Sequence, residues 1–206
     1  MSVSIENLVT SGTFSLDGGT WDVDNNVWIV GNDEECVIID SPHDAAAIIS
    51  QVRGRKVLAI LLTHAHNDHI GAAREVADAV NAPIHLHPED LVLWEQVYPD
   101  TTPDHHINDG DVFKVGGAEL KAIHTPGHSP GSTCFLLEDQ GTVFTGDTLF
   151  NGGPGATGRS YSDYPTILAS IRERLLTLPP ETVVRTGHGD NTTIGAERET
   201  LARVDQ

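Results

Sequence analysis

The stretch Leu61-Leu62-Thr63-His64-Ala65-His66-Asn67-Asp68-His69-Ile70-Gly71 places four metal-ligating side chains directly after an apolar run. In an extended chain, the side chains of residues 64, 66 and 68 point to the same side, whereas His69 faces a neighbouring volume. One short loop can therefore serve two metal positions. Imidazole and carboxylate ligands together suit zinc, and iron and manganese are the alternatives.

Three further ligand candidates lie downstream, each beside a glycine in a turn that follows apolar residues. His128 stands in Thr125-Pro126-Gly127-His128, Asp147 follows Val143-Phe144-Thr145-Gly146, and His188 stands in Thr186-Gly187-His188-Gly189. Glycine allows the backbone to turn sharply and leaves room for an ion. Each of these ligands is therefore expected at the end of a strand.

At these residues the chain resembles the metallo-β-lactamase superfamily, whose HxHxDH signature is spelled by residues 64–69. The later His, Asp and His follow in that family's order, and the resemblance covers nearly the whole chain. It implies a four-layered αββα sandwich of two mixed β-sheets flanked by helices, with the metals at one edge of the sheets. It also implies that one metal is held by His64, His66 and His128, that a second is held by Asp68, His69 and His188, and that Asp147 bridges both.

Within this superfamily the chain is similar to small glyoxalase II-like thioester hydrolases. The similarity lies in Thr125-Pro126-Gly127-His128 and in Thr145-Gly146-Asp147-Thr148-Leu149-Phe150, which is followed by Gly152-Gly153. β-Lactamases of this fold do not usually carry aspartate at the bridging position, so Asp147 argues against that activity. The implied function is hydrolysis of a small thioester with two zinc ions and a metal-bridging hydroxide. Asp68 is the predicted catalytic residue, which orients the nucleophile and takes its proton.

The loop after Phe150 departs from the glyoxalase II pattern. Residues 153–159 replace a shorter turn, and Arg159 and Tyr161 are the candidates for contacts with the substrate. Glyoxalase II proper also carries a helical C-terminal domain, whereas only 18 residues follow His188 here. We therefore expect one metallo-β-lactamase-fold domain over residues 1–206 without that addition. A homo-oligomer is expected if a neighbouring subunit completes the pocket.

Apolar runs and helical spacing outline the rest of the fold. The runs predict strands over residues 27–30, 36–39, 57–62, 84–86, 112–115, 120–123, 134–137, 143–145 and 182–184. Apolar residues at helical spacing predict helices over 44–52, 70–80, 88–98, 167–178 and 194–204. Strands that alternate irregularly with helices indicate a layered α/β or α+β domain.

The charge and composition of the chain limit the kinds of partner and the location that are expected. The 206 residues carry a formal net charge of −18, which repels phosphate backbones, so nucleic acid is not expected as a partner. No run of about 18 apolar residues indicates a membrane span. The N-terminus lacks the pattern of a signal peptide, which favours the cytoplasm. Cys36 and Cys134 lie inside apolar runs and are expected to be buried, reduced thiols.

Other activities of this fold stay open from the sequence. A persulfide dioxygenase would bind one iron at the positions of His64, His128 and Asp147, and a lactone hydrolase would use the full ligand pattern. Metal content and oxygen consumption separate the dioxygenase from a hydrolase, and substrate competition separates the lactonase. RNA processing also uses this ligand set, but the charge of −18 argues against it.

The remaining polar candidates are expected to have supporting roles. His85 and His87 flank Leu86 on a predicted strand and are expected to pack there, and His105-His106 is expected at the surface. His124 is expected to orient the loop of His128, and Asp40 to support a ligand from behind.

Overall fold

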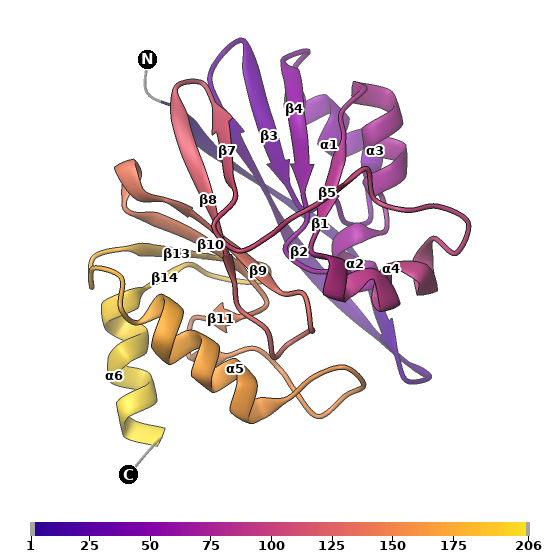
Figure 1. Ribbon diagram of the computed structural model, residues 1–206. Coiled ribbons are helices and arrows are strands. Elements are labelled where there is room, and N and C mark those ends of the chain that lie inside the picture. The colour runs from indigo at the N-terminus through magenta and orange to yellow at the C-terminus, as the bar shows by residue number, and fades with distance from the viewer. Residues whose placement is uncertain (1–2, 205–206) are drawn as a thin grey trace.

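Two six-stranded mixed sheets pack face to face, and helices cover the outer face of each sheet (Figure 1). The computed structural model describes residues 3–204. The predicted four-layered αββα sandwich is confirmed.

The first sheet is built from the first half of the chain. Its order is β1 (Ser4–Leu16), β2 (Gly19–Gly31), β3 (Glu35–Ile39), β4 (Lys56–Leu61), β5 (Ile84–Leu86) and β6 (His105–His106). The pairs β1–β2 and β2–β3 are antiparallel, and β3 to β6 are parallel. Parallel strands need crossovers, and helices provide them here.

The second sheet is built from the second half of the chain. Its order is β14 (Thr192–Thr193), β13 (Val183–Thr186), β10 (Thr142–Gly146), β9 (Thr133–Leu137), β8 (Ala118–His124) and β7 (Val112–Val115). Only β10 and β13 run parallel. A small hairpin of β11 (Leu149–Phe150) and β12 (Gly153–Pro154) stands apart from both sheets.

Side-chain alternation along the central strands produces three apolar layers. Ile38 faces the helices outside the first sheet, whereas Val37 and Ile39 face the second sheet. In the second sheet, Phe135 faces inward and Cys134 faces the outer helices. Because both faces are buried, these strands appear in the sequence as continuous apolar runs. Both cysteines are buried and free, as predicted.

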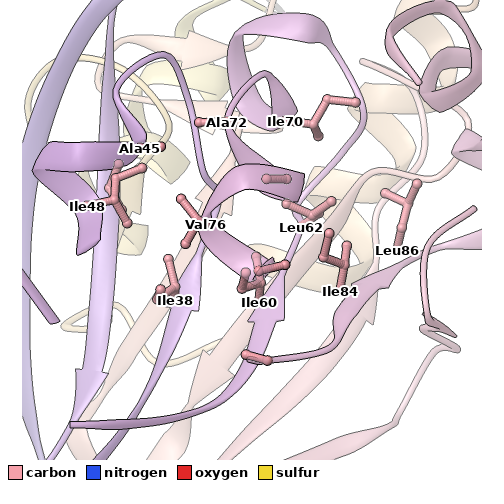
Figure 2. Packing of buried hydrophobic residues seen from close by; sticks show 14 of the residues in the cluster. Ile38, Ala45, Ile48, Ile60, Leu62, Ile70, Ala72, Val76, Ile84 and Leu86 are labelled. Carbon is pink, nitrogen blue, oxygen red and sulfur yellow. The ribbon is translucent and has the colours of Figure 1, made fainter. Parts of the chain in front are cut away.

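The helices cover the sheets with apolar faces. The helices α1 (Ala45–Val52), α2 (Asn67–Ile70), α3 (Ala73–Val80) and α4 (Leu91–Val97) lie on the first sheet. Figure 2 shows Ile48 and Val76 from two of them packed above Ile38 and Ile60. On the second sheet lie α5 (Tyr164–Ser170), which continues as a π-helical turn over Ile171–Leu175, and α6 (Ile194–Val204). Short 3₁₀ turns occupy Pro88–Asp90 and Glu138–Gln140.

The structure differs from the sequence expectations at the N-terminus and in two helices. A long hairpin of β1 and β2 begins at Ser4, whereas the first strand was expected at residue 27. The helix expected over 70–80 is interrupted between α2 and α3, and the one expected over 167–178 begins at Tyr164. Among residues 3–204, no helix has the length and apolar character to cross a membrane.

Candidate metal centre

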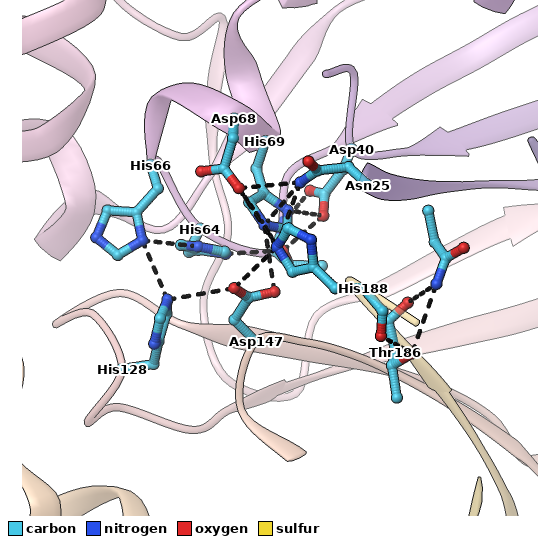
Figure 3. Close-up of polar contacts among 12 residues, drawn as sticks. Asn25, Asp40, His64, His66, Asp68, His69, His128, Asp147, Thr186 and His188 are labelled. Carbon is cyan, nitrogen blue, oxygen red and sulfur yellow. Dashed lines mark hydrogen bonds and ion pairs between the residues drawn. The ribbon is translucent and has the colours of Figure 1, made fainter. Parts of the chain in front are cut away.

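All seven predicted ligands gather where strands of both sheets end (Figure 3). Four of them, His64, His66, Asp68 and His69, follow β4 in the loop and short helix α2. The other three follow β8, β10 and β13, and they are His128, Asp147 and His188. Six of these seven side chains are almost fully buried, and the exception is His188, whose side chain is 24% exposed.

The ligand atoms form two adjoining clusters. His64, His66 and His128 form the first cluster, and Asp68, His69 and His188 the second, with ligand atoms within 4.8 Å of one another in each. Asp147 reaches both, because its carboxylate oxygens lie 3.5 Å from His128 Nε2 and 3.2 Å from His69 Nε2. One carboxylate thus stands between two sets of three ligands.

Hydrogen bonds on the outer side fix the tautomers of four histidines. His128 Nδ1 donates to the Ala156 carbonyl at 2.8 Å and His188 Nδ1 to the Asp24 carbonyl at 2.7 Å. His69 Nδ1 donates to Asp40 Oδ2 at 2.8 Å. His64 Nδ1 donates to Thr63 Oγ1 at 3.1 Å, since that hydroxyl gives its own proton to Asp40. In each ring the inner Nε2 is therefore the nitrogen that faces the other candidate ligands, as in metal-ligating histidines.

Ring nitrogens of both clusters converge on one another at hydrogen-bonding distance. His66 Nδ1 lies 3.0 Å from both His64 Nε2 and His128 Nε2, and His69 Nε2 lies 3.2 Å from His188 Nε2. The buried Oδ1 atoms of Asp68 and Asp147 have no hydrogen-bond partner. Buried polar atoms without partners are rare and call for an explanation such as an ion. The residues fit divalent metal.

The pKa shifts of the histidines and carboxylates in the two clusters also favour a bound cation. Burial and the neighbouring His128 lower the pKa of His66 to about 3, and burial also lowers that of His64 well below its ordinary value. Burial alone would lower the pKa of His188, but Asp147 and Asp68 outweigh it and raise that pKa to about 10. Against burial, His188 and His69 hold the pKa of Asp147 well below its ordinary value. The first cluster therefore offers neutral imidazoles, and the carboxylates attract positive charge.

Local backbone geometry permits this crowding. Asp40 follows β3 with φ of 62°, and its carboxylate accepts hydrogen bonds from the Thr63 amide at 2.8 Å and the Thr63 hydroxyl at 2.7 Å. The expected support of a ligand by Asp40 is thus present, through His69. A Cβ at Gly187 would lie 2.3 Å from Asp147 Oδ1, so only glycine fits beside the Asp147 carboxylate.

A cavity of about 210 Å³ opens onto the ligands. Its wall includes Phe14 from β1, Phe150 from β11 and Arg159. Arg159, a predicted substrate contact, therefore lines the cavity beside the candidate ligands. Tyr161 is 46% exposed and is not among the residues that line this cavity.

Sequence reasoning missed two residues that organise the centre. Asn25 of β2 donates from Nδ2 to Asp68 Oδ2 at 3.1 Å and accepts a bond from His43 Nε2 at 2.7 Å. Asp90 accepts hydrogen bonds from the two loops that carry the first cluster. The polar pair Asn25-Asn26 within a strand was a usable signal, whereas nothing local to Asp90 reveals its long-range contacts.

A further group of His87, Glu89 and His124 also has ligand atoms within 4.8 Å. The rings of His87 and His124 are stacked 4.0 Å apart with planes only 11° from parallel. An ion binds imidazole in the plane of the ring, and these two planes share no nearby point. His124 instead points Nε2 at the Pro130 carbonyl, at 2.9 Å, in the loop of His128, where it was expected.

Sequence comparison identifies relatives of this chain. Residues 20–188 match the family described as the metallo-beta-lactamase superfamily. The probable metallo-hydrolase YqgX of Bacillus subtilis is 36% identical over 182 residues, which cover 82% of this chain and 86% of YqgX. The hydroxyacylglutathione hydrolase GloC of Haemophilus influenzae is 32% identical over 182 residues, which cover 81% of this chain and 86% of GloC.

Solved structures share the fold. The BLEG-1 B3 metallo-beta-lactamase superimposes with a TM-score of 0.79 and 33% identity, covering 92% of this chain and 97% of that one. TTHA1623, solved in a di-iron-bound form, gives a TM-score of 0.77 and 34% identity, covering 93% of this chain and 98% of that one. Both cover nearly the whole αββα sandwich.

Proposed function

The chain belongs to the metallo-beta-lactamase superfamily of metallo-hydrolases, and from that premise we propose that it is a dinuclear enzyme that hydrolyses small thioesters. The observation that carries the proposal is the complete set of seven ligands in two adjoining clusters with a carboxylate between them. The relative GloC, a hydroxyacylglutathione hydrolase, supports the thioester as the substrate class.

In this proposal each cluster holds one ion. His64, His66 and His128 would bind the first ion, Asp68, His69 and His188 the second, and Asp147 both. Nitrogen and oxygen donors suit two zinc ions, and iron is the alternative that the di-iron form of TTHA1623 supports. When bound, such a pair supplies an activated water near neutral pH and Lewis acidity toward a carbonyl oxygen.

Asp68 would act as the catalytic base. Its Oδ2 accepts a hydrogen bond from Asn25, whereas its buried Oδ1 has no partner and is available to orient water and accept a proton. Although burial raises the pKa of Asp68, the charge of His69 and a hydrogen bond from His188 hold it below the ordinary value. Asp68 is therefore ionised at neutral pH, as a base must be.

Arg159 would bind the thiol part of the substrate. Its guanidinium is the only cationic group, metal ligands aside, among the residues that line the cavity in the described chain. In a protein with a net charge of −18, such a group favours a substrate that carries a carboxylate. A small peptide-like thiol ester with a terminal carboxylate has this chemistry.

The test combines metal analysis with an assay. We expect about two zinc ions per chain in protein purified without added metal, together with hydrolysis of S-lactoylglutathione. Asp68→Asn should abolish turnover, while Asp190→Asn, an exposed acid near His188 that belongs to neither cluster, should retain it. One iron per chain with oxygen consumption and no hydrolysis would instead indicate the persulfide dioxygenase, and turnover of a lactone or a cephalosporin alone would replace the thioester.

A further inference from the structure

Asp90 stands at the start of α4 but does not cap that helix. Aspartate at this position usually accepts a hydrogen bond from an amide in the first turn. Here the side chain makes no such bond and is fully buried, facing the loops that carry metal ligands. The residue is therefore placed for a contact elsewhere in the molecule.

Three donors from two separate loops converge on the Asp90 carboxylate. Oδ2 accepts from the Ala65 amide and from Ser129 Oγ, both at 2.8 Å, and Oδ1 accepts from the Gly131 amide at 2.5 Å. Although burial raises the pKa of Asp90 to about 6, this value is still below neutral pH, where the carboxylate is mostly ionised and acts as an acceptor. A carboxylate matches three donors, whereas an amide side chain would place its own donor against one of them.

The donors are neighbours, in the chain, of ligands of the first cluster and not of ligands of the second. Ala65 lies between His64 and His66, and Ser129 directly follows His128, so all three ligands of the first cluster are adjacent to an Asp90 contact. None of these donors is adjacent in sequence to Asp147 or to a ligand of the second cluster, although Ala65 shares its loop with Asp68 and His69. Asp40, in contrast, reaches both clusters, because it accepts from His69 Nδ1 and from the Thr63 hydroxyl that contacts His64.

The loop around Gly131 is shaped to allow this contact. A Cβ at Gly131 would lie 2.8 Å from the Asp90 backbone nitrogen and 2.9 Å from its Cβ. The backbone of the His128 loop therefore approaches α4 as closely as it does only because residue 131 is glycine. The close approach and the buried carboxylate are two independent features of the same junction.

We propose that Asp90 is a positioning residue that preorganises the His64, His66 and His128 cluster and sets its metal affinity separately from that of the second cluster. The proposal rests on the ligand assignment given above but not on the choice of substrate. Asp90 accepts no hydrogen bond from a ligand side chain, so it acts through the Ala65 and Gly131 amides and the Ser129 hydroxyl.

The test is a zinc titration of metal-free protein against a chromogenic chelator. His128→Ala and His188→Ala assign the two binding steps to the two clusters. We expect Asp90→Asn to weaken the first cluster by about 10–100-fold, the range typical of supporting residues around metals, and to leave the second within about threefold. Asp40→Asn removes a support that both clusters share, through His69 and through Thr63 and His64, so it should weaken both.

Two further variants separate positioning from general stability. Ile84→Val removes one methylene from the apolar layer of the first sheet on which α4 also packs, and it should leave both affinities unchanged. Gly131→Ala keeps the carboxylate but pushes the loop away, so it should reproduce the selective loss even if Asp90→Asn fails to fold. Equal weakening of both clusters, or no weakening in either variant, would overturn the proposal. A chain with these affinities that does not hydrolyse thioesters would overturn only the proposed substrate.

Discussion

The guanidinium carbon of Arg159 lies 4.1 Å from the ring centroid of Trp21. Trp21 belongs to β2 and pairs with Phe14 of β1 across the hairpin. Phe14 lies 5.3 Å from the same guanidinium, and the hairpin tip is held by a hydrogen bond from the Ser160 amide to Asp17 at 2.9 Å. The hairpin and the loop of Arg159 thus form one wall of the cavity. Aromatic faces restrict the cation to a position beside the ligands.

Arg159→Gln should weaken binding of an anionic thioester more than it slows the reaction. Removing the cation from the cavity wall removes an interaction with a part of the substrate that does not react, so KM is expected to rise about tenfold while kcat stays within about twofold. Steady-state assays with S-lactoylglutathione and with an uncharged thioester measure this. Arg53→Gln removes an exposed arginine paired with Glu6, far from the cavity, and should change neither constant. An equal effect on charged and uncharged substrates would contradict the role of Arg159.

Asn67 connects the ligand loop to the hairpin, and Asn67→Ala should loosen that connection. Its Oδ1 accepts from the Ser15 amide and its Nδ2 donates to the Thr13 carbonyl, both at 2.8 Å. Loss of these bonds should lower the free energy of unfolding by about 1–3 kcal/mol. Faster hydrogen exchange at the Ser15 amide measures the effect directly. The exposed Gln96→Ala serves as the control, and unchanged exchange at Ser15 would show that the contact does not hold β1.

Removal of metal should lower the melting temperature. Converging ring nitrogens and unpartnered carboxylate oxygens lack a partner in the metal-free protein, and an ion bound only by the folded state stabilises it. At a free metal concentration 100 times Kd, the gain is about 2.7 kcal/mol, which corresponds to roughly 5–10 °C for a chain of this size. Calorimetry before and after chelation measures the change. Identical melting with zinc, iron, manganese and chelator would argue against a metal centre.

His87 should make stability depend on pH. Burial, together with the neighbouring His124, lowers the pKa of His87 from 6.5 to about 4. Between these values the unfolded chain binds a proton that the folded chain excludes, so stability falls as pH drops from about 6.5 to about 4. Over that interval the parent should lose roughly 2 kcal/mol more than His87→Asn, which keeps an acceptor for the Glu89 amide. Urea unfolding at several pH values tests this, and parallel curves for the two proteins would contradict it.

The central strands and the ligand set could be predicted from the sequence because their signals are local. A strand buried on both faces is a continuous apolar run, and each ligand follows such a run directly. The β1 strand gives no such signal, since most of its side chains are exposed or half-buried and only Thr10 and Leu16 are buried. The dipeptide Asp17-Gly18, whose φ angles are 53° and 78° in the structure, is typical of hairpin turns. It was the one local sign of this hairpin in the sequence.

The remaining differences come from tertiary contacts. Asp90 occupies the beginning of a helix, where its local pattern predicts a cap, yet its bonds go to residues 25 to 41 positions away. The π-helical turn after α5 likewise follows from packing of Ile171 and Leu175 on the second sheet, not from any breaker in the sequence. Long-range contacts of this kind cannot be read from neighbouring residues.

Each sheet is made from one continuous half of the chain, and the ligands are divided between those halves. His64, His66, Asp68 and His69 come from the first, and His128, Asp147 and His188 from the second. Neither half therefore carries the whole candidate metal centre by itself, although each contains a complete sheet. If the chain were cut in the turn near Gly110, the two fragments would be expected to reassociate on addition of metal, and catalysis would report their complementation.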